Sequence, residues 1–98
     1  MANIFIETMT YIVPIEEVDP LLDQHLAFLK AGHEAGHFLA WGPRVPREGG
    51  VIFIRAENMA EAESFAAKDP YLVNGVATRE IIEWNPRFVG PGLEAFDE

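Results

Sequence analysis

Residues 19–46 read DPLLDQHLAFLKAGHEAGHFLAWGPRVP, and this stretch predicts one helix followed by one strand. Asp19 and Pro20 are typical of a helix start, because aspartate accepts from free N–H groups and proline is pre-set for the first turn. The helix should run to about Ala35 and end at Gly36, the residue type that most easily takes a left-handed exit. A strand should then cover residues 37–45.

The apolar residues of this helix fall on one arc when they are placed at about 100° per residue. His25 lies inside that arc, although the opposite side already carries the polar residues. A buried imidazole needs a hydrogen-bond partner, because an unpaired buried polar group costs roughly 1–3 kcal/mol. We therefore expect another part of the chain to supply that partner. The arc holds Leu22, Leu26, Leu29 and Gly36, with Leu21 and Gly32 at its edge.

The remaining elements complete the order βαββαβ. Strands are predicted over residues 3–13, 51–56 and 76–84, and Pro14 ends the first of them. A second helix should begin at Asn58, with Glu61 as its capping-box partner, and stop before Pro70. Residues 71–74 should form one turn, and an acidic tail covers about residues 87–98. We predict a single α+β domain over residues 1–98, ferredoxin-like, with a four-stranded antiparallel sheet and two helices on one face.

The first and third predicted strands are apolar on both faces. Two helices cover only one face of a four-stranded sheet, so the second face needs another cover. A second copy of the chain would supply it through a two-fold axis. We therefore expect a homodimer through the sheet face, or a higher oligomer. The acidic tail could extend across this face.

Composition excludes several classes of function. Seven basic residues against sixteen acidic ones, a net charge of −9, argue against nucleic-acid and anionic-membrane partners. Cysteine is absent, which excludes disulfides, thiolate metal sites and cysteine nucleophiles. The N-terminal residues carry no basic targeting segment, and no apolar run is long enough to span a bilayer. A cytoplasmic protein is the expectation.

Asp69 is the first candidate partner for His25. It continues the inward stripe of the second helix after Phe65 and Ala66, and both helices should cover the same sheet face. A carboxylate on one imidazole nitrogen leaves the other nitrogen free as a general acid or base. A structural interpretation also fits, in which Asp69 only caps the turn that begins at Pro70 and His25 is a core histidine.

Two further patterns invite a functional interpretation. His33 to His37, HEAGH, matches the zinc-peptidase pattern H-E-x-x-H, but Gly36 should break the helix that such a site requires, so we expect no metal there. Arg44 and Arg47 follow Trp41 at the end of the hairpin and could hold an anionic or aromatic ligand, or serve as surface ion-pair partners. The sequence has no phosphate loop, G-x-S-x-G elbow or dinucleotide fingerprint, and we expect no cofactor.

The ordered segments HLAFL, AGH, LAWGPRVP, GGVIFIRAE and KDPYLVNGV resemble the YciI-like (YCII-related) family. The resemblance covers the chain from the first strand to about Pro86. It implies a dimeric ferredoxin-like α/β barrel, related to muconolactone isomerases, with a His/Asp active site. The family's histidine and aspartate fall on His25 and Asp69, accompanied by Gly42, Pro43 and Pro70. One branch resembles a dehydrochlorinase that acts on a chlorinated hydroxyhydroquinone.

Two functional hypotheses follow. The first is a cofactor-independent lyase or isomerase that acts on a small cyclic or aromatic compound. His25 and Asp69 would be catalytic, and the substrate would be bound by Tyr11, Trp41, Gly42, Pro43, Arg44 and Pro70. The second is a dimeric module that binds a small molecule or a partner protein without turnover.

Overall fold

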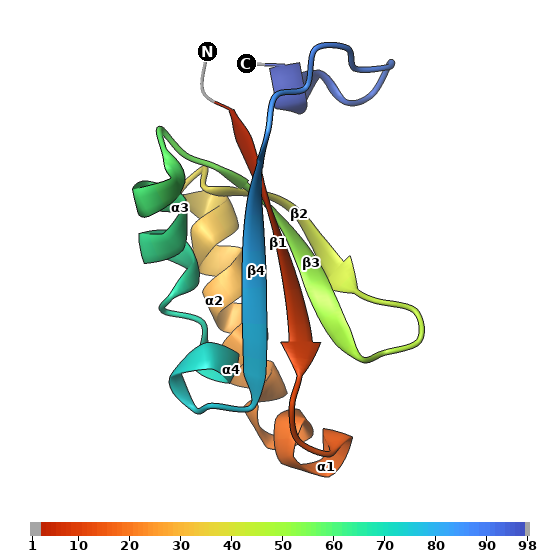
Figure 1. Cartoon of the computed structure of the whole chain (residues 1–98), viewed down its shortest axis with the longest axis vertical. Helices are drawn as coiled ribbons and strands as arrows, with labels where there is room; N and C mark the ends of the chain where they lie inside the picture. The colour runs from red at the N-terminus through yellow and green to blue at the C-terminus, as the bar shows by residue number, and fades with distance from the viewer. Residues whose placement is uncertain (1–2, 98) are drawn as a thin grey trace.

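The sheet of this protein has the predicted ferredoxin-like layout. The computed structural model describes residues 3–97; residues 1, 2 and 98, which the predicted domain and tail include, lie outside the described residues. Its strands are β1 (Ile4–Tyr11), β2 (Phe38–Pro43), β3 (Gly49–Arg55) and β4 (Ala77–Trp84). They pair antiparallel in the order β2-β3-β1-β4, so β1 and β3 are central. The two longer helices, α2 (Leu22–Glu34) and α3 (Met59–Ala66), lie together on one side of this sheet (Figure 1).

The first helical segment begins earlier than Asp19. The chain turns helical at α1 (Ile15–Val18), continues through the 3-10 turn η1 (Asp19–Leu21) and enters α2 (Leu22–Glu34). Asp19 makes no capping bond there; its side chain instead accepts a 2.9 Å hydrogen bond from Arg47. The predicted cap was wrong because helical backbone already precedes Asp19, which leaves no free N–H groups for it to cap.

The other helices begin or end at the residues that the sequence indicates. Asn58 accepts from the backbone N–H of Glu61 and begins α3 (Met59–Ala66), as the capping-box pattern indicates. The short helix α4 (Pro70–Val73) starts after Asp69, which caps it. Gly36 follows the C-terminal end of α2 and has φ +84°, a conformation that favours glycine.

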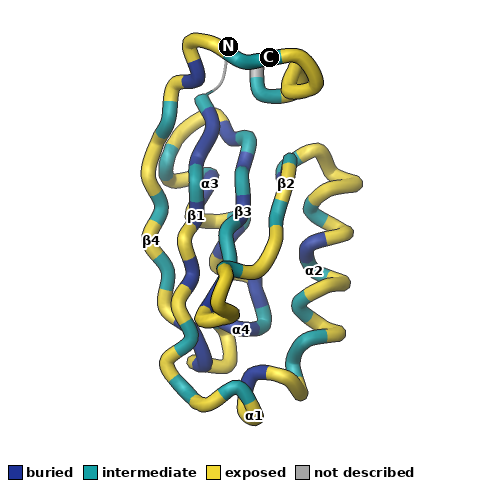
Figure 2. Tube along the Cα trace, turned by 90° about the vertical axis from the view of Figure 1, so that its right-hand side faces the viewer, coloured by how far each residue is buried: buried dark blue, intermediate teal, exposed yellow. Residues whose placement is uncertain are grey.

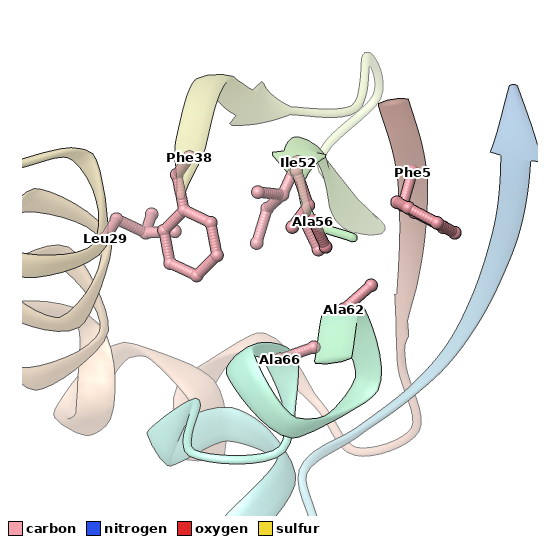
Figure 3. Close-up of a cluster of buried hydrophobic side chains, with 8 residues drawn as sticks. Phe5, Leu29, Phe38, Ile52, Ala56, Ala62 and Ala66 are labelled. Carbon is pink, nitrogen blue, oxygen red and sulfur yellow. The ribbon is translucent and has the colours of Figure 1, made fainter. Parts of the chain in front are cut away.

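The main core lies between the helices and the helix-facing side of the sheet (Figure 3). It is built from Phe5 on β1, Ile52 and Ile54 on β3, Phe38 on β2, Leu29 on α2 and three buried alanines, Ala56, Ala62 and Ala66. Gly32 lets α2 pack closely on Phe38: a Cβ atom there would lie 2.1 Å from the phenyl ring. This close approach fixes α2 against the strand that carries Trp41.

The opposite face of the sheet is largely uncovered (Figure 2). Ile82 is 59% exposed, while Ile6, Val51 and Phe53 are half-buried. The C-terminal segment covers one end of this face, because Phe96 of the turn η2 (Glu94–Asp97) stacks with Phe53 and meets the edge of Trp84. Among residues 3–97, no helix is both long and apolar enough to cross a membrane.

Candidate active site

His25 and Asp69 meet at the end of the helical layer. The imidazole Nδ1 of His25 lies 2.8 Å from Oδ1 of Asp69, although the residues are 44 positions apart in the chain. The Asp69 side chain is 1% exposed and that of His25 is 13% exposed. The second imidazole nitrogen, Nε2, is therefore the atom left for a ligand.

The same oxygen atom of Asp69 both caps α4 and contacts His25. Its Oδ1 also accepts a 2.9 Å hydrogen bond from the backbone N–H of Tyr71, which begins α4. Both sequence interpretations of Asp69 thus describe one carboxylate. Because the cap fixes the carboxylate and the carboxylate contacts the imidazole, the α4 start determines the orientation of the His25 ring.

Tyr71 supports the imidazole from its flat side. Its ring stacks on His25 with centroids 3.9 Å apart and an angle of 11° between the planes. It also meets the edge of Tyr11 at 5.8 Å. The imidazole is held by a carboxylate at one edge and by an aromatic ring on one face, an arrangement that leaves little rotational freedom.

A cavity of about 190 Å³ opens beside this pair. Its walls come from α2, the ends of β1, β2 and β3, and Tyr71. Tyr11, Trp41, Gly42 and Pro43, all expected near the substrate, line it with His25. Most of the remaining lining is apolar: Met9, Leu22, Leu26, Leu29, Val51 and Ile52.

Two residues expected at the substrate lie elsewhere. Arg44 is outside this cavity: its guanidinium donates to Thr10 Oγ1 at 3.1 Å and borders a separate surface hollow. Pro70 is the first residue of α4 and does not line the cavity either. Arg47, three residues after Arg44 in the loop between β2 and β3, lines the cavity instead.

The two histidines of the HEAGH segment, His33 and His37, make separate contacts. Helix α2 ends at Glu34, between them. His33 Nδ1 lies 3.1 Å from the carbonyl oxygen of Phe38, while the His37 ring stacks on Phe65 at 3.7 Å. Among the described residues, no group of three or more histidines and carboxylates is placed to hold a metal ion.

Glu7 is a buried acid that interacts electrostatically with Asp69. It lies on the helix-facing side of β1, is fully buried, and neither of its carboxyl oxygens has a hydrogen-bond partner within residues 3–97. Burial, together with the negative charge of Asp69, raises the pKa of Glu7 to about 7, and the positive charge of Arg79 opposes the rise. At neutral pH this carboxyl is therefore part protonated.

The sequence carried a weak signal for Glu7 and less for the other missed residues. Glu7 is the one charged residue among Phe5, Met9 and Tyr11 on the same side of a predicted strand, a recognisable exception to that pattern. Arg47 had the same composition signal as Arg44. Tyr71 had no separate signal, because only the folded chain stacks its ring on His25.

Comparisons with known proteins agree with this geometry at the level of family and fold. No curated protein sequence matches the chain significantly. Among solved structures it is similar to a 5-chloro-2-hydroxyhydroquinone dehydrochlorinase from Burkholderia phenoliruptrix AC1100, determined in complex with 2,5-dihydroxybenzoquinone. The TM-score is 0.72 and the identity 19%, over 84% of this chain and 93% of the other.

A second similar structure is SnoaB, a cofactor-independent oxygenase from Streptomyces nogalater. Here the TM-score is 0.51 and the identity 14%, over 91% of this chain and 96% of the other. Both likenesses are likenesses of fold. The model of the YCII-related domain matches residues 4–85 of the 98, which include all four strands, His25 and Asp69. The chain therefore belongs to the YCII-related domain family.

Proposed function

We propose that this protein is a cofactor-independent lyase or isomerase that acts on a small cyclic or aromatic compound, with His25 as the proton-transfer group and Asp69 as its orienting partner. The main support is the 2.8 Å contact between the two side chains at the wall of an apolar cavity. A carboxylate on Nδ1 favours the tautomer in which Nε2 is free to accept a proton.

The proposed reaction starts at a carbon–hydrogen bond next to a carbonyl group. His25 Nε2 takes the proton, the electron pair moves into the ring as an enolate, and Asp69 stabilises the imidazolium. Return of that proton to a different carbon gives an isomer. Departure of a leaving group, with its electron pair, from the adjacent carbon gives a lyase reaction.

The surroundings suit this chemistry. Apolar walls exclude water from a developing charge, and Tyr71 holds the imidazole plane in place. The similar fold of a dehydrochlorinase and of a cofactor-independent oxygenase supports an enzyme in this family, though each of those activities is named for that protein alone. The alternative, a dimeric module without turnover, is favoured by the exposed apolar side chains on the open sheet face.

The exchange His25→Asn tests the proposal. The native protein is assayed by absorbance and mass spectrometry against a panel of halogenated hydroquinones, hydroxyquinones and unsaturated lactones. We expect turnover of at least one compound, and its loss in His25→Asn by about 10²–10⁴-fold with binding retained. The matched control is His37→Asn, since that ring lies against Phe65 and away from the cavity.

Two outcomes would reject the enzyme. One is the absence of turnover by the native protein across the panel. The other is equal turnover by the native protein and His25→Asn. If a compound nevertheless binds, the binding module becomes the better description.

A further inference from the structure

Three polar side chains besides His25 reach the cavity: Tyr11, Arg47 and Tyr71. Each of them offers hydrogen-bond donors, and none of the lining residues is an aspartate or a glutamate. The chain as a whole carries a net charge of −9, so a cavity wall with one arginine and no carboxylate differs from the rest of the molecule. We call Tyr11, Arg47 and Tyr71 the donor cluster.

The hydroxyl group of Tyr71 is buried near the guanidinium group of Arg47. Tyr71 is 1% exposed, and its hydroxyl oxygen has no hydrogen-bond partner of normal geometry among residues 3–97. Such a group is rare in folded proteins, because desolvation without a partner costs free energy. Burial raises the pKa of Tyr71 to about 12, and the nearby charge of Arg47 opposes that rise. The hydroxyl therefore keeps its proton at neutral pH and can donate it to a ligand.

Arg47 is oriented over the cavity by two contacts. Its Nη1 donates to Asp19 Oδ1 at 2.9 Å, and its guanidinium carbon lies 5.7 Å from the centre of the Tyr11 ring. The guanidinium has five N–H donors in a rigid fork, so the bond to Asp19 uses one edge and holds the group in place. Asp19 is half exposed and does not line the cavity, so the N–H donors of Arg47 that do not contact Asp19 remain available to a ligand there.

We propose that the donor cluster is the binding site for an anionic oxygen of the ligand, a carboxylate, phenolate or enolate, and that Arg47 and Tyr71 give the cavity its preference for anions. The apolar walls would hold the attached ring against Trp41 and Leu26, and Tyr71 would link the anion to the imidazole on which it stacks. The anion would be the substrate only if the proposed enzyme function holds, whereas the preference for anions does not depend on turnover.

The cavity is large enough for a ligand of one ring. An apolar protein cavity of about 150 Å³ is enough to bind benzene, and this cavity measures about 190 Å³. A six-membered ring with one or two oxygen substituents fits that space.

The test compares binding of matched anionic and neutral rings, which requires no turnover. The probes are benzoate against benzamide, and 2,5-dihydroxybenzoquinone against its neutral dimethyl ether, measured by calorimetry at neutral pH. We expect each anion to bind at least about tenfold more tightly than its neutral counterpart, as a hydrogen bond to a charged group predicts. Tighter binding of benzoate would indicate a carboxylate site, and tighter binding of 2,5-dihydroxybenzoquinone would indicate a phenolate or enolate site.

Two variants assign the preference to the donor cluster. Arg47→Met keeps an unbranched apolar stem without the guanidinium group and should abolish the preference, whereas Tyr71→Phe removes one hydroxyl and should weaken anion binding about tenfold with neutral binding unchanged. The matched control is Arg44→Met, which removes the same charge from the same hairpin outside the cavity. If Arg47→Met does not fold, as judged by circular dichroism, Tyr71→Phe carries the test alone.

Equal binding of anionic and neutral rings by the native protein would overturn the inference. So would an equal loss of preference in Arg44→Met and Arg47→Met, because net charge alone would then explain it. These results are independent of His25. Turnover that depends on His25 without any preference for anions rejects only the donor cluster, and a preference for anions without turnover rejects only the enzyme.

Discussion

At the scale of single residues, Asp69 carries the largest share of the site. One oxygen, Oδ1, contacts the imidazole of His25 and accepts the N–H of Tyr71 that starts α4. A substitution at this residue therefore alters both the helix start and the site. The effects of different substitutions at Asp69 on stability separate its role as a helix cap from its role as the partner of His25.

We predict that Asp69→Ala lowers the free energy of unfolding by about 2–4 kcal/mol, because it removes a helix cap and a buried hydrogen bond to His25. Asp69→Asn should cost less, since asparagine is an equally good cap. Urea unfolding followed by circular dichroism gives both values. Equal losses in the two variants would contradict the capping role of Oδ1.

Glu7 makes a prediction about pH. Its pKa is about 7 in the folded protein and 4.5 for the free group, so between these values the folded state holds a proton that the unfolded state has released. The free energy of unfolding must then fall as pH rises through this window. The loss amounts to roughly 3 kcal/mol, from about 1.4 kcal/mol per pKa unit.

The variant Glu7→Gln removes this titration while it preserves the shape of the side chain. Relative to the native protein, it should gain stability as pH rises from about 4 to about 8. Urea unfolding at a series of pH values measures the difference, and the subtraction cancels the other acids. Parallel curves for the two proteins would show that Glu7 titrates normally in the folded state.

At the scale of elements, α2 determines the position of His25 through its contact with β2. The helix approaches the strand closely at Gly32, where the Phe38 ring occupies the space of a side chain. About one turn before that contact Leu29 packs into the core, and about two turns before it His25 reaches Asp69. The close approach therefore holds the helix at the depth that the cavity requires.

We predict that Gly32→Ala destabilises the protein by about 1–3 kcal/mol, because its Cβ overlaps the Phe38 ring. The sign is informative, since alanine in place of glycine inside a helix would otherwise stabilise it by about 1 kcal/mol. Thermal unfolding measures the change. Lys30→Ala, at an exposed position of the same helix, serves as the control and should stay within about 0.5 kcal/mol. A more stable Gly32→Ala would contradict the packing argument.

At the scale of the whole molecule, the sheet has one face covered by helices and one face left open (Figures 1 and 2). The C-terminal segment covers only the end of the open face near Phe53 and Trp84. Ile82 and its half-buried neighbours remain on this face, and a contiguous apolar patch is typical of an interaction surface. The homodimer expected from the sequence stays a prediction, and this face is where it belongs.

We predict that the native protein has the mass of two chains in solution and that Ile82→Glu shifts it to one chain, because a charge buried in an interface is costly. Light scattering coupled to gel filtration measures the mass. Val73→Glu is the control, since Val73 is 69% exposed on α4, on the helical side of the sheet. A native monomer, or dissociation by both variants, would argue against pairing through the open face.

The sequence contained most of the information about the elements and less about the site. Apolar spacing and caps such as Asn58 locate the strands and helices, because these signals act within one turn or one strand. His25 stood out as a polar residue on an apolar arc, and Asp69 as an acid on an inward stripe. The first helix was assigned too late in the chain, since the sequence does not reveal that helical backbone precedes Asp19.

Local pattern by itself determined the βαββαβ order and the exclusion of cysteine chemistry, because each depends on residue type and near neighbours. Tertiary structure alone decided that Arg47 and not Arg44 reaches the cavity, that Tyr71 stacks on His25, and that Glu7 is buried and interacts electrostatically with Asp69. These facts depend on the path of a loop and on contacts between residues far apart in the chain. No spacing along the sequence encodes them, since they arise only when the helices close over the sheet.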